Sequence, residues 1–364
     1  MVSVNLEFFK GKTVLITGHT GFKGAWLCHI LKRAGANVHG YALEAERGSL
    51  FEVSSVSDGM NSVVSDIRDM TKLAHVFHQA NPEIVLHMAA QPLVLDSYAR
   101  PAYTFDTNVM GTVNLLECVR GSETVRSVVV VTTDKVYKNL EWAYGYREVD
   151  ALGGSDPYSA SKACAEIVSE SYRASFLHSK NIPISTARAG NVIGGGDISA
   201  NRIIPDCIRA AVKGKPIIIR NPSSVRPYQH VLEPLFAYLY IAKMQYESYD
   251  FAGNYNIGPE ESDCVTTGEL ADIFCNEWGE NQSWEDVSEP GAPHEANLLR
   301  LDCSKIRSKL GWRPVWNLKT AIAKTIEWEK ANHAADHATE DITTVMNNQI
   351  DEYLEGVGNG GFTR

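Results

Sequence analysis

A glycine-rich turn between a short apolar strand and an apolar helix constrains this fold more than any other stretch. Residues 13–17 (TVLIT) predict a buried strand, residues 25–31 predict a helix, and between them lies GHTGFKG with Gly18, Gly21 and Gly24. Glycine permits a tight turn at the first position, close approach of a diphosphate at the second and close helix packing at the third. The amino terminus of the helix would face the phosphates. The flanking strand and helix therefore favour a dinucleotide-binding turn over an ordinary glycine turn.

Short apolar runs recur along the first half of the chain at the spacing of a parallel α/β sheet. Strands are predicted at 38–43, 63–66, 83–88, 128–131 and 184–189, with helical segments between them, one of them from about 101 to 119. The four-valine run at 128–131 is typical of a strand buried on both faces. The sequence therefore predicts an α/β fold: a doubly wound Rossmann-type parallel sheet with a smaller mixed α/β substrate lobe.

The element signals become shorter and more irregular after about residue 190. We expect residues 1–190 to form the dinucleotide-binding domain and residues 191–330 to form mainly the substrate lobe, with part of that chain returning to the first domain. A closing helix is predicted at 318–329. Residues 331–364 become polar and end in GVGNGGFTR, which predicts a peripheral C-terminal tail.

Composition excludes several classes of function. The formal net charge of -10 and the pI near 5.6 argue against a nucleic-acid surface, which needs a basic patch. No apolar run is long enough for a signal peptide or a membrane span, so we expect a cytoplasmic protein that does not bind membranes. The seven cysteines are odd in number and never spaced as a metal clip, so we expect neither disulfides nor a metal site.

The strand at 128–131 and the helix after it bring proton-carrying side chains to one edge of the sheet. The strand ends in Thr132, Thr133, Asp134 and Lys135, where open α/β sheets place their ligands. Asp156 and Pro157 then open a helix that carries Tyr158 and Lys162 four residues apart on one face.

This Tyr–Lys spacing occurs about once by chance in such a chain, so its place after the strand gives it weight. A nearby ammonium lowers the pKa of a phenol, so we expect Tyr158 to act as a base on an alcohol. Lys162 would also bind the nicotinamide ribose, and Thr133 would hold the reacting hydroxyl.

Other side chains at strand ends are candidates for the rest of a dinucleotide. Asp66 could accept from the adenine amine, or could cap the helix that begins near Met70. Glu44 or Glu46 could bind the adenosine ribose, whereas Lys23 and Arg47 could meet a 2′-phosphate, so NAD and NADP both stay open. The predicted cofactor-binding set is Gly18, Gly21, Phe22, Lys23, Gly24, Asp66, Ile67, Ala89, Ala90, Gln91, Thr132, Tyr158 and Lys162.

Two polar residues in the same region are given structural roles. The amide of Asn108 is unusual inside a helix, and we expect it to hydrogen-bond backbone in the sheet. His87 is interpreted as a core histidine and not as a catalyst.

The substrate lobe gathers cations in an otherwise acidic chain. Arg202, Arg220, Arg226, Gln229 and His230 cluster in sequence, and His294 and Arg300 follow later. Guanidinium groups bind phosphate well, although each of these arginines could equally lie on a solvated face. The predicted substrate-binding residues are Asn191, Arg202, Arg226, Gln229, His230 and His294.

With these motifs in place, the chain resembles the extended branch of the short-chain dehydrogenase/reductase family, specifically the nucleotide-sugar 4,6-dehydratases. The resemblance covers residues 12 to about 329 and rests on GHTGFKG, HMAAQ, TTDKVY, YSASK and RPYQHV. It implies NAD as cofactor and a lyase reaction in deoxysugar or polysaccharide precursor synthesis. Lys135 stands where deoxythymidine-linked members carry glutamate, so this chain looks like the cytidine-linked branch, which implies CDP-glucose as substrate.

The resemblance also implies roles for the central residues. Tyr158 takes the 4-hydroxyl proton while hydride passes from carbon 4 to NAD, Asp134 protonates the departing 6-hydroxyl, and the hydride returns to carbon 6. Lys135 is either the base at carbon 5 or a charged group that stabilises the enolate.

The sequence leaves other functions open. The alternatives to a CDP-glucose dehydratase are a nucleotide-sugar epimerase, a dehydratase for another nucleotide, and an NAD-binding regulator without catalysis.

The resemblance implies a homodimer formed by the helices that carry Tyr158 and Asn108. Ile167 and Leu115 fit such an interface, and equally fit packing within one chain.

Overall fold

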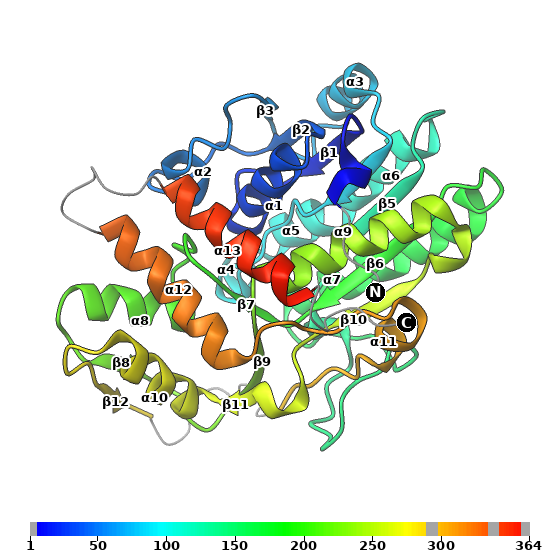
Figure 1. Cartoon of the computed structure of the whole chain (residues 1–364). Helices are drawn as coiled ribbons and strands as arrows, with labels where there is room; N and C mark the ends of the chain where they lie inside the picture. The colour runs from blue at the N-terminus through cyan, green and yellow to red at the C-terminus, as the bar shows by residue number, and fades with distance from the viewer. Residues whose placement is uncertain (1–5, 289–297, 334–341, 358–364) are drawn as a thin grey trace.

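A seven-stranded parallel sheet forms the centre of the molecule in the computed structural model, which describes residues 6–288, 298–333 and 342–357 (Figure 1). Its order is β10-β6-β5-β4-β1-β2-β3, and each neighbouring pair is parallel. The strands are β1 Thr13–Thr17, β2 Asn37–Ala42, β3 Asn61–Val64, β4 Ile84–His87, β5 Ser127–Val131, β6 Ile184–Ala189 and β10 Asn254–Ile257. The order reverses between β1 and β4, so the predicted doubly wound Rossmann-type fold is confirmed.

Helices cover both faces of this sheet because its central strands are apolar on both sides. Alternate residues of β5 belong to different cores: Val129 and Val131 pack with α1, α9 and α13, whereas Val128 and Val130 pack with α3 and α6. This alternation is the two-residue period of a strand. The bounds are α1 Phe22–Arg33, α3 Met70–Ala80, α6 Gly111–Arg120, α7 Pro157–Tyr172, α9 Leu232–Glu247 and α13 Ile342–Gly356.

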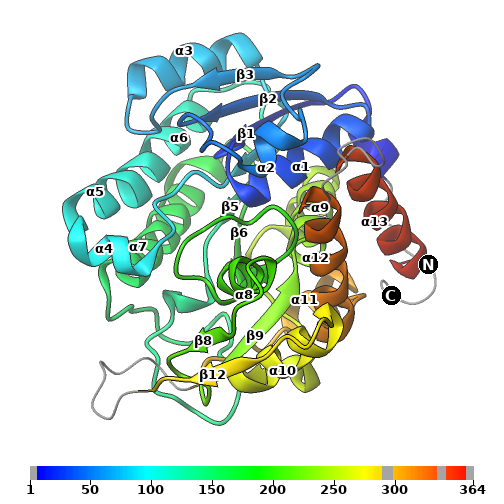
Figure 2. The ribbon, with the colours of Figure 1, turned by 90° about the vertical axis from the view of Figure 1, so that its left-hand side faces the viewer.

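A smaller lobe lies below the sheet in Figure 2 and has its own core. It holds a three-stranded sheet in the order β11-β9-β7 and a two-stranded sheet of β12 and β8. Its elements are β7 Asn191–Ile193, α8 Ile203–Val212, β8 Ile217–Ile219, β9 Val225–His230, β11 Cys264–Thr266, α10 Thr267–Trp278, β12 Trp284–Asp286 and α12 Leu318–His333. Between β9 and β11 the chain returns to the large sheet as α9 and β10.

Short elements make up most of the connections. They are η1 Leu6–Phe9, α2 Leu50–Val53, α4 Val94–Ala99, α5 Pro101–Phe105, η2 Asp106–Met110, η3 Asp134–Val136, η4 Arg173–Leu177, η5 Tyr249–Phe251, η6 Glu261–Asp263 and α11 Ser304–Leu310. The helix expected from about 101 to 119 is therefore α5, η2 and α6 in succession, with one π-helical turn at Asp106–Met110. None of the helices in the described ranges is long and apolar enough to cross a membrane.

The C-terminal helix differs from the expected peripheral tail. Met346, Ile350 and Tyr353 of α13 are fully buried in the core that also contains α9. The Tyr353 hydroxyl donates to Glu233 Oε2 at 2.8 Å, and Glu233 also accepts from two backbone N–H groups of residues 315 and 316. Amphipathic spacing of apolar residues within a polar stretch thus produces a packed helix. Residues 334–341 and 358–364 lie outside the described ranges.

Candidate active site

The glycine turn is built as the sequence predicts. A Cβ on Gly18 would lie 2.7 Å from the backbone N of Ala89, and one on Gly24 would lie 2.2 Å from Gly18 O. Gly18 also has a φ of +77°, which favours glycine. Gly21, in contrast, is exposed and has no close neighbour except Gly18 O at 3.5 Å. No side chain caps α1 at Gly21, so the open turn and the first N–H groups of α1 fit a diphosphate.

The carboxylate of Asp134 is the centre of the group at the end of β5. It is fully buried; Oδ1 accepts from Thr133 Oγ1 at 2.9 Å and from Lys135 Nζ at 3.0 Å, while Oδ2 has no hydrogen-bond partner. Lys135 Nζ also donates to Asn191 Oδ1 at 3.4 Å. A buried carboxylate oxygen without a partner is uncommon, and it leaves Asp134 one oxygen with which to exchange a proton.

Tyr158 and Lys162 lie in the first turns of α7, which Asp156 caps by accepting from Ser159 N at 2.9 Å. Both side chains are at least nine-tenths buried, and Lys162 Nζ donates to Val131 O at 3.1 Å. Burial lowers the pKa of Lys162 to about 8, and the nearby Glu166 opposes that shift.

The expected lowering of the Tyr158 pKa is not found in the protein alone. Burial raises this pKa to about 12, Thr133 and Arg202 oppose the rise, and Asp134 adds to it. Desolvation of the buried phenol is the largest cause, and Lys162, whose ammonium donates to Val131 O, is not among the groups that lower this pKa.

Lys23 points into this group and not toward the adenosine side. Its ammonium lies 5.8 Å from the centre of the Tyr238 ring, and its electrostatic neighbours are Lys162, Arg202, Asp134 and Asp197. Burial and the two neighbouring cations lower the pKa of Lys23 to about 7. The idea that Lys23 could meet a 2′-phosphate is therefore wrong for this conformation, since these neighbours belong to the catalytic group.

The predicted residues near β4 are mostly held by one another. Asn108 Oδ1 accepts from Gln91 N at 2.8 Å, and Asn108 Nδ2 donates to Gln91 O and to Ser161 Oγ. The expected bond from Asn108 to backbone is thus present, just beyond β4, and the π-helical turn carries it. The Gln91 side chain bonds Thr104 and residue 93, so its side chain is already occupied. Ala89 and Ala90 are half-buried at the end of β4.

Three other predicted cofactor residues, Asp66, Ile67 and Thr132, also have contacts within the chain. Asp66 forms an ion pair with Arg68 at 2.8 Å, and the cap of α3 is Asp69, so the alternative role of Asp66 as a cap is wrong. Ile67 is buried; a Cβ on Gly111 would lie 2.7 Å from its side chain, which leaves the Ile67 backbone for any ligand contact. The Thr132 hydroxyl donates to Glu166 Oε1 at 2.5 Å.

His87 and Phe22 complete the surroundings of the cofactor turn. His87 is buried, Thr17 Oγ1 and Thr112 Oγ1 lie 2.7 and 3.1 Å from its ring nitrogens, and burial lowers its pKa to about 3. This is the core histidine that was expected. Phe22 lies against the loop of the small lobe, since a Cβ on Gly194 would be 3.1 Å from its ring.

The predicted substrate residues separate into two groups. Arg202 pairs with the buried Asp197 at 3.0 Å and is an electrostatic neighbour of Tyr158, and Asn191 contacts Lys135. Arg226 is half-buried and donates to Val225 O at 2.9 Å. Of these, Arg202 and Asn191 lie with the catalytic group.

His230 and Gln229 are buried in the fold. His230 is fully buried, and its ring centre lies 4.9 Å from that of Trp316 and 6.4 Å from that of Trp26. Gln229 is 2% exposed and donates to Ile257 O. Gln229 Oε1 and His230 Nε2 have no hydrogen-bond partner among the described residues, as Asp134 Oδ2 has none, so the substrate role of both residues stays a prediction. His294 lies outside the described residues.

A buried ion pair behind the catalytic strand was missed in the sequence. Glu166 Oε2 accepts from Arg188 Nη2 at 2.8 Å and from Thr186 Oγ1 at 2.7 Å. Glu166 follows Lys162 by four residues, so the helical spacing places both on one face of α7 and could have indicated it. Nothing in the sequence around Arg188 on β6 indicates its partner, because the pair joins separate elements.

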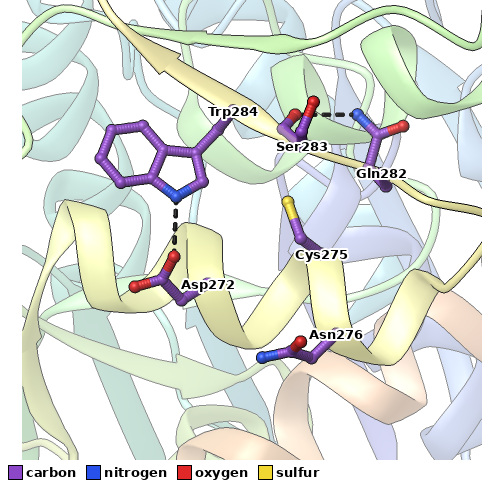
Figure 3. A pocket seen from close by; sticks show the side chains of 6 residues that line it. All are labelled: Asp272, Cys275, Asn276, Gln282, Ser283 and Trp284. Atoms are coloured by element: carbon purple, nitrogen blue, oxygen red, sulfur yellow. Dashed lines mark hydrogen bonds between the residues drawn. The ribbon is translucent and has the colours of Figure 1, made fainter.

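A separate hollow lies at the far side of the small lobe, between α10 and β12 (Figure 3). It is lined by Asp272, Cys275, Asn276, Gln282, Ser283 and Trp284, and the Trp284 indole donates to Asp272 Oδ1 at 2.8 Å. It contains none of the predicted site residues. Among the described residues no group of His, Cys, Asp and Glu side chains could hold a metal ion.

Comparisons with known proteins show the family and the fold of this chain. Residues 15–325 match the GDP-mannose 4,6 dehydratase family. The CDP-glucose 4,6-dehydratase of Salmonella typhimurium is 47% identical over 90% of this chain and 93% of that protein. The dTDP-glucose 4,6-dehydratase of the same organism is 27% identical over 88% and 93%. The structure of Thermus thermophilus UDP-glucose 4-epimerase in complex with NAD superimposes with a TM-score of 0.75 at 25% identity, covering 88% of this chain and 99% of that one.

Proposed function

This chain belongs to the GDP-mannose 4,6-dehydratase family, and we propose that it is the NAD-dependent lyase that converts CDP-D-glucose to CDP-4-keto-6-deoxy-D-glucose. The much higher identity to the CDP-linked relative than to the dTDP-linked one supports the cytidine nucleotide. The observation that carries the reaction type is the buried Asp134, with its free Oδ2, beside Thr133 and in electrostatic contact with Tyr158. Oxidation alone needs only the phenol, whereas loss of water needs this acid as well.

NAD fits the residues of the glycine turn. The exposed Gly21 and the uncapped start of α1 would take the diphosphate, and Lys162 would bind the nicotinamide ribose. When bound, NAD would supply a hydride acceptor for carbon 4 and, once reduced, a hydride donor for carbon 6.

Tyr158 acts on the 4-hydroxyl in the first half of the reaction. Its phenolate takes the hydroxyl proton, and the Thr133 hydroxyl holds the same oxygen by a second hydrogen bond. Because burial raises the pKa of Tyr158 to about 12, the phenolate needs cations around it. Lys162 and Arg202 are the candidates that this chain supplies.

Asp134 and Lys135 act in the second half. The 4-ketone makes the proton on carbon 5 acidic, and a base must take that proton; neutral Lys135 is the candidate. Asp134, in its protonated form, gives its proton through the unpartnered Oδ2 to the departing 6-hydroxyl, which leaves as water. Lys135 contacts Asp134 at 3.0 Å, and an ammonium at this position would instead stabilise the enolate, so both roles of Lys135 stay predictions.

The two lobes would bind different parts of the cofactor and substrate. Residues 1–190, with the returning α9 and β10, form the NAD-binding part, and residues 191–330 supply Asn191, Arg202 and Arg226 for the nucleotide sugar. Residues beyond 331 add the packed helix α13.

A homodimer through α5, η2, α6 and α7 is supported by exposed apolar side chains. Ile167 is 58% exposed, and Met110 of η2 and Phe105 of α5 are also exposed. Leu115 is fully buried and packs within its own chain, the second of the two roles left open for it. A cytoplasmic location and a part in lipopolysaccharide O-antigen precursor synthesis stay predictions.

Product analysis tests the function. Purified protein with NAD is incubated with CDP-, UDP- and dTDP-glucose, and the products are identified by mass spectrometry and NMR. We expect a 4-keto-6-deoxy sugar, lighter by one water, from CDP-glucose in preference to the other two. A CDP-galactose product would indicate a 4-epimerase, and cofactor binding without any product would indicate a regulator.

A further inference from the structure

Glu166 is the one buried carboxylate of α7 that faces the catalytic lysine from within the same helix. It lies one turn after Lys162, and its side chain is 1% exposed. Thr132 Oγ1 donates to Oε1 at 2.5 Å, and Thr186 Oγ1 and Arg188 Nη2 donate to Oε2 at 2.7 and 2.8 Å. Three donors from β5 and β6 therefore fix this carboxylate in one position.

Arg188 anchors the other side of the network. Its Nη1 donates to the Tyr137 hydroxyl at 2.8 Å and to Glu148 O at 3.2 Å, and Tyr137 in turn donates to Asn256 Oδ1 at 2.6 Å. Glu166 stabilises the guanidinium and so raises the pKa of Arg188. The network thus spans α7, β5, β6 and β10, directly behind the Thr133–Asp134 end of β5.

The position of Glu166 has a consequence for Lys162. The ammonium of Lys162 makes its bond to Val131 O, one residue before Thr132, so the lysine and Glu166 hold adjacent residues at the end of one strand. The other charged or titratable groups near Lys162 are Lys23 from the start of α1, His87 from β4, whose imidazole is neutral, Tyr158 from α7 itself, and Arg188 from β6 behind Glu166. Glu166 favours the charged form of Lys162.

We propose that Glu166 is a positioning residue for the dehydratase reaction, which holds the end of β5 and keeps Lys162 in its ammonium form for the nicotinamide ribose and Tyr158. The expected effect of Glu166 on turnover rests on the proposed function. The expected effect of Glu166 on the protonation of Lys162 does not, because it depends only on side chains of this protein. Burial lowers the pKa of Lys162 to about 8 even with Glu166 opposing that shift, so loss of this one buried negative charge brings the pKa of Lys162 still closer to neutral.

The test is the pH dependence of cofactor affinity and of kcat/KM. In Glu166→Gln, which keeps the size and an acceptor oxygen, the Lys162 pKa falls. The alkaline limb of both profiles should then move about 0.5–1 pH unit lower. Thr186→Val is the matched control, since it removes a neutral donor from the same carboxylate and should leave the alkaline limb in place.

Two outcomes overturn the proposal. One is a Glu166→Gln protein that is folded by circular dichroism and has an alkaline limb coincident with the wild type. The other is an equal shift in Thr186→Val, which would indicate general loosening of the network. If Glu166→Gln alone does not fold, Glu166→Gln with Arg188→Met removes both charges of the pair; it should show a smaller shift in the same direction, because the opposing charge of Arg188 is lost as well, and no shift at all would overturn the proposal.

The readouts separate this inference from the proposed function. Affinity for NADH, measured by fluorescence titration, does not require a sugar substrate. A shift in NADH affinity without any product from CDP-glucose would support the role of Glu166 and contradict the dehydratase assignment. Product formation from CDP-glucose with no shift in NADH affinity would support the dehydratase assignment and contradict the role of Glu166.

Discussion

Replacing Glu233 by glutamine should stabilise this protein at alkaline pH and not at acid pH. Glu233 is fully buried on α9, and its two oxygens accept from the N–H groups of Val315 and Trp316 and from the Tyr353 hydroxyl. Glutamine can keep all three contacts, because its oxygen accepts from the two N–H groups and its amide donates to the tyrosine oxygen. The substitution therefore removes a charge and leaves the hydrogen bonds in place.

The magnitude follows from the pKa of Glu233. Burial raises it from 4.5 to about 7, against the three hydrogen bonds and helped by Asp263. The folded state therefore binds a proton that the unfolded state has already released, so wild-type stability falls as pH rises between about 4.5 and 7. At about 1.4 kcal/mol for each pH unit, ionised Glu233 costs about 3 kcal/mol above pH 7.

Urea unfolding at pH 5 and pH 8 measures this cost. The difference in free energy of unfolding between Glu233→Gln and wild type should rise by about 2–3 kcal/mol from pH 5 to pH 8. Tyr353→Phe is the opposite control, because it keeps the carboxylate, removes one donor and should destabilise by about 1–3 kcal/mol, mostly at pH 8. A constant difference between Glu233→Gln and wild type across this range would refute the argument.

Three further predictions concern the catalytic group and the dimer. Lys135→Ala should abolish water elimination yet keep slow reduction of bound cofactor by CDP-glucose, followed as NADH absorbance; unchanged turnover would remove Lys135 from the mechanism. Tyr158→Phe should lower kcat by about 10²–10⁴-fold with little change in NAD affinity, and a loss confined to KM would contradict its role as the base. Ile167→Asp should convert a dimer to a monomer in light scattering without unfolding it, and a dimer that persists would place the interface elsewhere.

Much of the fold was determined by the sequence alone, because its signals are local. The strand at 13–17 and the glycine turn after it depend on neighbouring residues, and the strand at 184–189 was found with its observed bounds. Asp156, Tyr158 and Lys162 are fixed relative to one another by helical geometry within α7. The identity of Asp134 and Lys135 after β5 likewise needed no long-range information.

Tertiary packing decided what sequence could not. His230 and Gln229 belong to the core because α1, α12 and residues near 316 cover β9, and no local pattern shows such cover. Lys23 reaches the catalytic group because β1, which precedes α1, and β5 end at the same edge of the parallel sheet, and Glu166 finds Arg188 only when β6 pairs with β5. Tertiary packing also decides how much water reaches a titratable side chain. The pKa values of Tyr158 and Glu233 are raised because residues distant in the chain exclude water from them.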